Sequence, residues 1–204
     1  MENPMVDYSK LIAETASNHY NVRDEYKQNT YEQNVAISLS EQRKFSVGCI
    51  NVTGCLNIGI IIRTSLLMGA ESIYLFGRNK FDRRSCVGSE NYITINKFVY
   101  DNPLSCDEEL VSQLEELEQK HTIVLCELGG HELQADNLSF YNQFTKPPLF
   151  LFGSESHGVP QLVLDKFPFK ISIPQRGVLR SYNVSTAASI IVYDYVKTMF
   201  FTNK

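Results

Sequence analysis

The residues best suited to chemistry lie in one stretch near the C-terminus, Ile171 to Tyr195. It begins as an alternating, strand-like run that Pro174 ends, because proline cannot donate to a strand ladder. A buried helix is then predicted by apolar residues at helical spacing, Ala187, Ile190, Ile191 and Tyr195. The loop between the two elements carries polar groups and a glycine: Gln175, Arg176, Gly177, Arg180, Ser181 and Asn183. Since loops held by rigid elements often carry function, we expect a site here; a plain strand-to-helix turn with surface arginines is the alternative.

Apolar runs and amphipathic segments alternate along the chain before this stretch. Buried strands are expected at 45–52, 71–77, 121–128 and 149–153, and an extended segment at 91–100. Helices are expected at 58–68 and 107–120, with a short one within 155–167. This alternation predicts an α/β fold with a mainly parallel sheet covered by helices on both faces. Ligands bind such sheets beyond the carboxyl ends of the strands, where the polar segments 57–63, 153–158 and 176–183 fall.

Size and composition fit one globular domain with an N-terminal extension. Of the 204 residues, 43% are hydrophobic and 21% charged, and the formal net charge is −4. This charge argues against a surface that binds nucleic acid everywhere, but it allows a local basic patch. Residues 1–44 are polar, with a weak helical spacing at Leu11, Ala13, Ala16 and Tyr20. We therefore expect a helical or partly disordered extension at 1–44 and a domain at 45–204.

The five cysteines are odd in number and form no CxxC pair, which disfavours a disulfide framework or a zinc site. We expect buried or inert thiols in a reducing compartment, the cytoplasm or the nucleus. The N-terminus has no signal-peptide pattern, and no apolar run is long enough to cross a bilayer. We expect no bound metal.

Four cationic side chains crowd the loop after the second predicted strand: Arg78, Lys80, Arg83 and Arg84. A charge run of this kind is usually a solvated surface. Next to a nucleic-acid site it would instead bind phosphates and make the affinity depend on salt.

Three segments, NIGIIIRTSLLMGA, LFGSESHGVP and IPQRGVLRSYNVS, follow one another in this order. Their order and spacing resemble the three signature motifs of the SpoU (TrmH) family, the 2′-O-ribose RNA methyltransferases of the SPOUT superfamily. The resemblance covers roughly residues 45–200. The third motif is most similar to that of the eukaryotic-type tRNA guanosine-18 ribose methylases. The resemblance implies a C-terminal deep trefoil knot that forms the S-adenosylmethionine pocket, with two subunits pairing across it.

The motifs match residue by residue. The matching positions are Asn57, Gly59 and Arg63 in the first motif, Gly153, Glu155 and Gly158 in the second, and Ile173, Pro174, Gly177, Ser181, Asn183 and Ser185 in the third. Tyr182 stands where the family usually has leucine. That change is tolerable if the family's contact there is through the backbone, and it reshapes the pocket if the side chain packs on the adenine.

The resemblance implies roles for specific residues. Catalytic roles are implied for Arg63, Asn57, Glu155, Ser181 and Asn183. Cofactor contacts are implied for Glu127, Leu128, Gly129, Leu151, Gly153, Ile173, Gly177, Tyr182 and Asn183. RNA contacts are implied for Arg63, Arg78, Lys80, Arg83, Arg84, Arg176 and Arg180.

The chemistry of two of these side chains limits what they can do. An ordinary guanidinium has no free acceptor, so we expect Arg63 to bind a phosphate and hold the ribose 2′-hydroxyl, not to act as a base. A solvent-facing arginine is the alternative. Glu155 fits either a catalytic group or a structural acceptor that fixes Asn57 and Asn183, and we favour the structural role.

The predicted activity is methyl transfer from S-adenosylmethionine to a ribose 2′-hydroxyl of RNA, with tRNA favoured over rRNA. The alternative is a catalytically silent RNA-binding subunit on the same fold. A different small-molecule enzyme is disfavoured, because no G-x-G-x-x-G follows the first strand. An accessory protein for substrate choice is a further expectation, since no appended RNA-binding domain is recognised.

Overall fold

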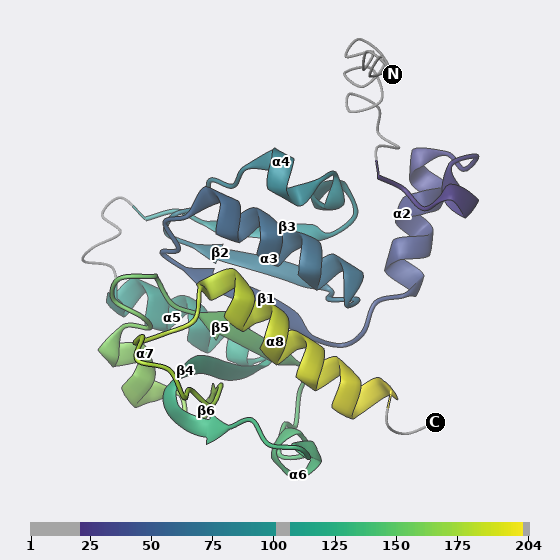
Figure 1. The fold of residues 1–204 in the computed structure, drawn as a ribbon. Coiled ribbons are helices and arrows are strands. Elements are labelled where there is room, and N and C mark those ends of the chain that lie inside the picture. The colour runs from purple at the N-terminus through teal and green to yellow at the C-terminus, as the bar shows by residue number, and fades with distance from the viewer. Residues whose placement is uncertain (1–20, 101–106, 202–204) are drawn as a thin grey trace, which may run out of the picture.

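A parallel six-stranded sheet forms the centre of the protein (Figure 1). The computed structural model describes residues 21–100 and 107–201, so the predicted spacing from Leu11 to Tyr20 lies outside the described residues. The strands are β1 (Ser46–Ile50), β2 (Ser72–Phe76), β3 (Thr94–Phe98), β4 (Thr122–Glu132), β5 (Pro148–Phe152) and β6 (Phe169–Ser172). They lie in the order β3-β2-β1-β5-β4-β6, and each neighbouring pair is parallel. The predicted sheet is confirmed.

Helices cover both faces of this sheet, as predicted (Figure 1). One face carries α3 (Cys55–Leu67), α4 (Arg83–Cys86) and α8 (Val184–Val196), and the other carries α5 (Asp107–Glu118) and α7 (Gln161–Lys166). The short helix α6 (Leu138–Tyr141) follows β4, and a π-helical turn, η3 (Lys197–Phe201), continues α8. Each face therefore has its own buried hydrophobic cluster.

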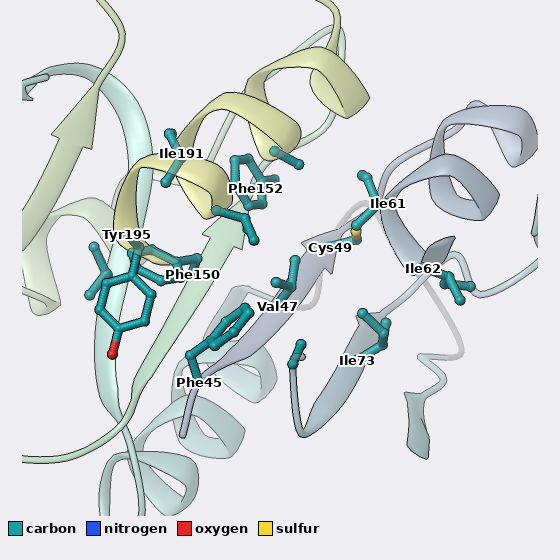
Figure 2. Close-up of a cluster of buried hydrophobic side chains, with 14 of the residues drawn as sticks. Phe45, Val47, Cys49, Ile61, Ile62, Ile73, Phe150, Phe152, Ile191 and Tyr195 are labelled. Carbon is teal, nitrogen blue, oxygen red and sulfur yellow. The ribbon is translucent and has the colours of Figure 1, made fainter. Parts of the chain in front are cut away.

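The cluster under α3 and α8 is shown in Figure 2. Val47 of β1 and Phe150 of β5 are fully buried, and Ile61 of α3 and Ile191 of α8 belong to the same cluster, with Ile61 on the side of Cys49. The ring of Tyr195 lies edge-on to that of Phe150, with centroids 5.2 Å apart. This packing fixes both helices on the sheet, and with them the loops that precede each helix.

The buried stripe of α8 differs from the predicted one. It consists of Val184, Ser185, Ala188, Ile191, Val192, Tyr195 and Val196. The prediction was right for Ile191 and Tyr195 but wrong for Ala187 and Ile190, which are only half-buried. The helix is apolar around most of its circumference, so its contacts with the sheet and α3 decide which side is buried.

Short helices occupy two segments that carry no strand. The cationic loop contains α4, capped by Asp82, and the 3₁₀ turn η2 (Ser89–Asn91) follows it. In the N-terminal extension, a 3₁₀ turn η1 (Asp24–Tyr26) precedes α2 (Tyr31–Ser40), which Thr30 and Gln33 begin with a capping box. The trefoil knot of the resemblance stays a prediction.

Candidate active site

The loops after β1 and β5 meet where the strand order reverses. From β1 the sheet continues to one side through β2 and β3, and to the other through β5, β4 and β6. Parallel sheets bind ligands in the crevice at such a point. Thr53 and Gly54 follow β1, and Glu155 follows β5, so these residues reach the same edge of the sheet.

Glu155 accepts hydrogen bonds that tie these loops together. Its Oε2 accepts from the Thr53 backbone N–H at 2.9 Å and from the Thr53 hydroxyl at 3.1 Å. Its Oε1 accepts from the Gly54 N–H at 3.1 Å and from the Asn57 side-chain amide at 2.9 Å. The carboxylate therefore holds the end of β1 and the first turn of α3 in one position.

These donors also set the charge of Glu155. Partial burial opposes its ionisation, but hydrogen bonds from the Thr53 N–H, the Asn57 amide and the Gly54 N–H outweigh that effect and lower the pKa from 4.5 to about 2. Glu155 is thus an anion at neutral pH, and a carboxylate with so low a pKa is a weak proton acceptor. The geometry supports a positioning role, which stays a prediction.

Asn57 carries the contact on to the third motif. Its Oδ1 accepts from Nδ2 of Asn183 at 3.1 Å. Asn183 is the N-cap of α8, and its own Oδ1 accepts from the Ser185 N–H at 2.9 Å and the Ser185 hydroxyl at 2.6 Å. The network of Glu155, Asn57, Asn183 and Ser185 therefore joins all three motifs, although these segments are distant from one another along the chain.

The loop after β5 folds back on itself. Ser154 and Gly158 exchange backbone hydrogen bonds of 3.1 and 2.9 Å. A Cβ on Gly153 would collide with the Gly158 backbone, and Gly158 itself has φ +66°, a conformation that favours glycine. Oε2 of Glu127 accepts from the Val159 N–H at 3.1 Å, which anchors this loop to the end of β4.

β4 bulges beside this loop. Ile171 of β6 opposes both Cys126 and His131, so residues 127–130 pair with neither β5 nor β6. Gly129 has φ +78°, and no described atom lies within 4 Å of where its Cβ would stand. Leu128 is 54% exposed. The Leu128 N–H donates to Oε1 of Glu127 and the Gly130 carbonyl accepts from the Ser172 hydroxyl. The bulge therefore offers backbone outside the ladder, together with an apolar side chain, at the carboxyl edge of the sheet.

The remaining predicted cofactor residues lie at different depths. Ile173 is half-buried at the start of the loop between β6 and α8, where Gly177 and Tyr182 are exposed. The Tyr182 hydroxyl lies 3.5 Å from the Pro174 carbonyl oxygen. Leu151 is fully buried within β5 and paired on both sides, so the structure does not place it at a ligand surface.

Arg63 and Ser181 are not brought into the network. Arg63 is exposed on α3, and its side chain makes no hydrogen bond or ion pair with any other described residue. On a helix of 3.6 residues per turn it points about 120° away from Asn57. Ser181 is likewise exposed on the loop before α8. Both belong to the candidate site by resemblance rather than by a contact within this chain.

The predicted RNA-binding cations fall into two groups. Arg83 pairs with Glu90 at 3.0 Å, and Arg84 pairs with Asp82 at 2.6 Å. The other five cations are exposed and make no ion pair with the part of the chain that the structure describes: Arg63, Arg78, Lys80, Arg176 and Arg180. The positive charges of the second group are therefore available to bind an anion from outside the protein.

Two residues with hydrogen bonds in this site, Ser185 of the network and Thr53, which donates to Glu155, were not among the predicted catalytic residues. Ser185 was identified only as a motif match, although an N-cap side chain commonly accepts from the backbone N–H two positions after it. Thr53 gave no signal in the sequence, because its contact depends on Glu155, far along the chain.

Other features of the described residues bear on the predictions. Cys49 and Cys86 are buried, whereas Cys55 is exposed; burial raises the pKa of Cys49 to about 12. Across 21–100 and 107–201, no group of three or more His, Cys, Asp or Glu residues is placed to hold a metal ion. No helix within those ranges has the length and apolar character required to cross a membrane.

Comparisons with known proteins agree with the resemblance. A 103-residue segment, 50% of the chain, is 30% identical to a Saccharomyces cerevisiae tRNA (guanosine(18)-2′-O)-methyltransferase, of which it covers 7%. The chain also matches three further relatives and covers 47%, 59% and 52% of their length, which is less than two thirds of each protein.

Solved structures share the fold. The A. aeolicus TrmH/SpoU tRNA modifying enzyme has a TM-score of 0.64 at 24% identity, with 82% of this chain and 83% of that chain covered. The AdoMet-bound rRNA methyltransferase from Sinorhizobium meliloti has a TM-score of 0.62 at 24% identity, with 78% and 57% covered. The model of the SpoU rRNA Methylase family matches residues 44–193, which is more than half of the chain. The chain therefore belongs to the SpoU rRNA Methylase family.

Proposed function

We propose that the protein transfers a methyl group from S-adenosylmethionine to a ribose 2′-hydroxyl in RNA. The observation that carries this proposal is the network of Glu155, Asn57, Asn183 and Ser185, which joins the three family motifs at the reversal point of the sheet. Family membership supports the same conclusion.

The residues at the carboxyl edge fit the cofactor. Backbone of 127–130 that lies outside the strand ladder can hydrogen-bond polar edges of an adenine or ribose where it has no side-chain partner, and Leu128 and Ile173 offer apolar surface. The backbone beside Gly153 allows close approach. When bound, S-adenosylmethionine supplies an activated methyl group. The AdoMet complex of the Sinorhizobium meliloti relative is consistent with this assignment.

The protein's own contribution is orientation and charge. Asn183 caps α8 and holds the loop that carries Ser181 and Tyr182, while Glu155 fixes the start of α3. The guanidinium of Arg63, without an ion pair to any described residue, can hold a phosphate or ribose oxygen through its planar fork. Ser181 would position that arginine or the reacting hydroxyl.

tRNA is the favoured substrate class, with rRNA second. The name of the Saccharomyces cerevisiae relative supports tRNA. The uncompensated cations Arg78, Lys80, Arg176 and Arg180 lie in loops at the carboxyl edge and suit phosphates. The division into an extension at 1–44 and a methyltransferase domain at 45–204 belongs to the proposal, as does an accessory protein for substrate choice.

A homodimer also belongs to the proposal. Leu56, Ile60 and Leu67 are 58%, 40% and 72% exposed, and with Arg63 they form one stripe along α3. The loop before α8 adds Val178 and Leu179, at 102% and 79% exposure. An apolar stripe of this kind is typical of a surface covered by a partner, and Arg63 would then reach the site of the second copy.

Mixing two inactive variants tests this arrangement. Arg63→Ala and Asn183→Ala are each expected to be inactive alone. If Arg63 acts across the interface, a mixed dimer keeps one intact site, so random pairing restores about a quarter of the wild-type sites. Light scattering that finds only monomer, or a mixture that stays inactive after verified exchange of subunits, would contradict the proposal of a shared site.

The activity itself is tested with tRNA and purified protein. Calorimetry is expected to show S-adenosylmethionine binding, and mass spectrometry is expected to show ribose methylation. Arg63→Ala should lower single-turnover methylation on the order of 10²-fold or more with cofactor affinity nearly unchanged, and Arg63→Lys should rescue little. Arg23→Ala, an exposed arginine of the extension, is the control. Cofactor binding without methylation of any RNA would favour the silent subunit.

A further inference from the structure

The cationic loop after β2 is bonded at two points to the segment that follows β1. At the start of the loop, the Arg78 N–H donates to Oδ1 of Asn51 at 3.3 Å. Four residues later, the Asp82 N–H donates to the Cys55 carbonyl at 3.1 Å. The part of the loop between these two bonds therefore takes its position from the segment after β1.

The same segment supports the Glu155 network. The backbone N–H groups of Thr53 and Gly54 donate to the Glu155 carboxylate at 2.9 and 3.1 Å. Both residues lie between the two that hold the cationic loop. Segment 51–55 is thus bonded both to the loop that carries the cations and to the carboxylate that connects the three motifs.

Asn51 has a backbone conformation that few residues adopt. Its φ is +50°, in the left-handed region, which asparagine tolerates better than most side chains. Its own N–H donates to the Phe76 carbonyl at 2.9 Å, so the residue remains bonded to β2 just beyond the last strand pair. The half-buried side chain reaches the end of β2 from this position and bonds the loop there.

Gly77, at the end of β2, leaves room for that side chain. A Cβ on Gly77 would collide with Oδ1 of Asn51, and its φ of +73° also favours glycine. The Gly77 N–H donates to the Phe98 carbonyl at 2.7 Å, which continues the pairing toward β3. The ends of three neighbouring strands are therefore fitted to one another around the Asn51 side chain.

The far part of the cationic loop packs against α3 through small groups. Figure 1 shows α4 beside α3, and a Cβ on Gly59 of α3 would collide with the Ser85 hydroxyl of α4. The Ser85 hydroxyl in turn donates to the Asp82 carbonyl at 2.7 Å. Of the two bonds that fix the loop to segment 51–55, only the one from Asn51 involves a side chain, so it can be removed by substitution.

The cations and the network have to act on one substrate molecule. Arg78 and Lys80 are exposed and suit phosphates, which determine where the RNA lies. We propose that Asn51 is a positioning residue for the RNA substrate: by holding the start of the cationic loop, it fixes the bound phosphates relative to the network. This inference rests on the proposed function, because it takes the reaction to be methyl transfer to RNA. A shift of about 1 Å in a reactant is enough to cost on the order of 10²-fold in rate.

The test compares the single-turnover rate of tRNA methylation at saturating RNA and cofactor with the affinities for RNA and for S-adenosylmethionine. Asn51→Gly tolerates the positive φ and removes only the side chain, so the variant should fold. It should lower the rate about tenfold or more, with both affinities within about threefold of the wild type. Asn51→Asp, which keeps an acceptor and tolerates the same φ, should retain most of the rate.

Two further variants show whether the effect belongs to positioning. Asn21→Gly is the matched control, because Asn21 is exposed in the extension and also has a positive φ, +61°. Its rate should equal that of the wild type. Arg78→Ala removes a phosphate contact and should show the opposite pattern to Asn51→Gly, with RNA affinity and its salt dependence reduced more than the rate.

The outcomes separate this inference from the proposed function. A folded Asn51→Gly variant with the rate of the Asn21→Gly control overturns the positioning role and leaves the proposed activity intact. A loss of RNA affinity without a loss of rate also overturns it, because the side chain would then support binding only. An Asn51→Asp variant as slow as Asn51→Gly shows that the acceptor is not what matters. A wild-type protein that methylates no RNA refutes the proposed function, and this inference with it.

Discussion

Replacing Glu155 by glutamine removes one charge while nearly keeping the shape of the side chain. The carboxylate accepts four hydrogen bonds, two on each oxygen. A glutamine keeps one oxygen, so two donors lose their acceptor and face an amide NH₂ group. A hydrogen bond to a charged group contributes roughly 1.5–3 kcal/mol, and solvent exposure at this loop reduces that. We therefore expect Glu155→Gln to lower the free energy of unfolding by roughly 1–2 kcal/mol at pH 7.

The pH dependence of this loss follows from the pKa of Glu155. The folded-state pKa is depressed from 4.5 to about 2. A depressed carboxylate stabilises the fold fully above its unfolded value and loses that contribution as pH falls toward the folded value. The difference in unfolding free energy between wild type and Glu155→Gln should thus be constant from pH 7 to about 5 and shrink between pH 4.5 and 2.

Urea unfolding at pH 7, 5 and 3 measures both effects, with Glu116→Gln as the control for losing an exposed carboxylate. The same variant should bind S-adenosylmethionine more weakly, because Asn57 and Asn183 lose their fixed orientation. A stability difference that does not change between pH 5 and 3 would show that the carboxylate is not held as an anion by these donors, and would refute the reasoning.

Two more substitutions test the packing of the loop after β5 and the anchoring of α8. Gly153→Ala places a methyl group against the Gly158 backbone, so it should lower the free energy of unfolding by roughly 1–3 kcal/mol and weaken cofactor binding. A variant with the urea unfolding and the cofactor affinity of the wild type would contradict the close packing of this loop. Tyr141→Phe removes the donor that its hydroxyl supplies to Asp194 at 2.7 Å and should cost about 1–3 kcal/mol, whereas Tyr193→Phe, 51% exposed on α8, should cost little. Equal costs for the two tyrosine variants would contradict that assignment.

The sheet could be predicted because its strands are continuous apolar runs. β1 and β5 are buried along their whole length, which is what strands covered on both faces require. The extension of β4 to Glu132 could not be predicted, because Glu127 to Gly130 leave the ladder in a bulge and their polar, glycine-rich sequence indicates a loop. The start of α3 at Cys55 was likewise missed, because Gly54 replaces the usual polar cap.

The site depended on a different kind of information. Asn57 contacts Glu155 and Asn183 across 98 and 126 positions of sequence, and hydrophobic periodicity carries no record of such polar pairs. These residues were predicted to form one site only because the three motifs follow one another in the order that the family has. The ion pairs of Arg83 and Arg84 were not predicted either, although their partners Glu90 and Asp82 are only seven and two positions away, because the turns around α4 decide which charges meet.

The distribution of charge reconciles RNA binding with a net charge of −4. Acidic residues gather on α5, which covers the sheet face opposite α3 and α8: Asp107, Glu108, Glu109, Glu115, Glu116 and Glu118. Five exposed cations without an ion pair to a described residue lie on α3 and in the loops at the carboxyl edge: Arg63, Arg78, Lys80, Arg176 and Arg180. A polyanion is repelled from the first face and attracted to the second, so this distribution of charge would orient the proposed RNA substrate toward the edge where the three motifs meet.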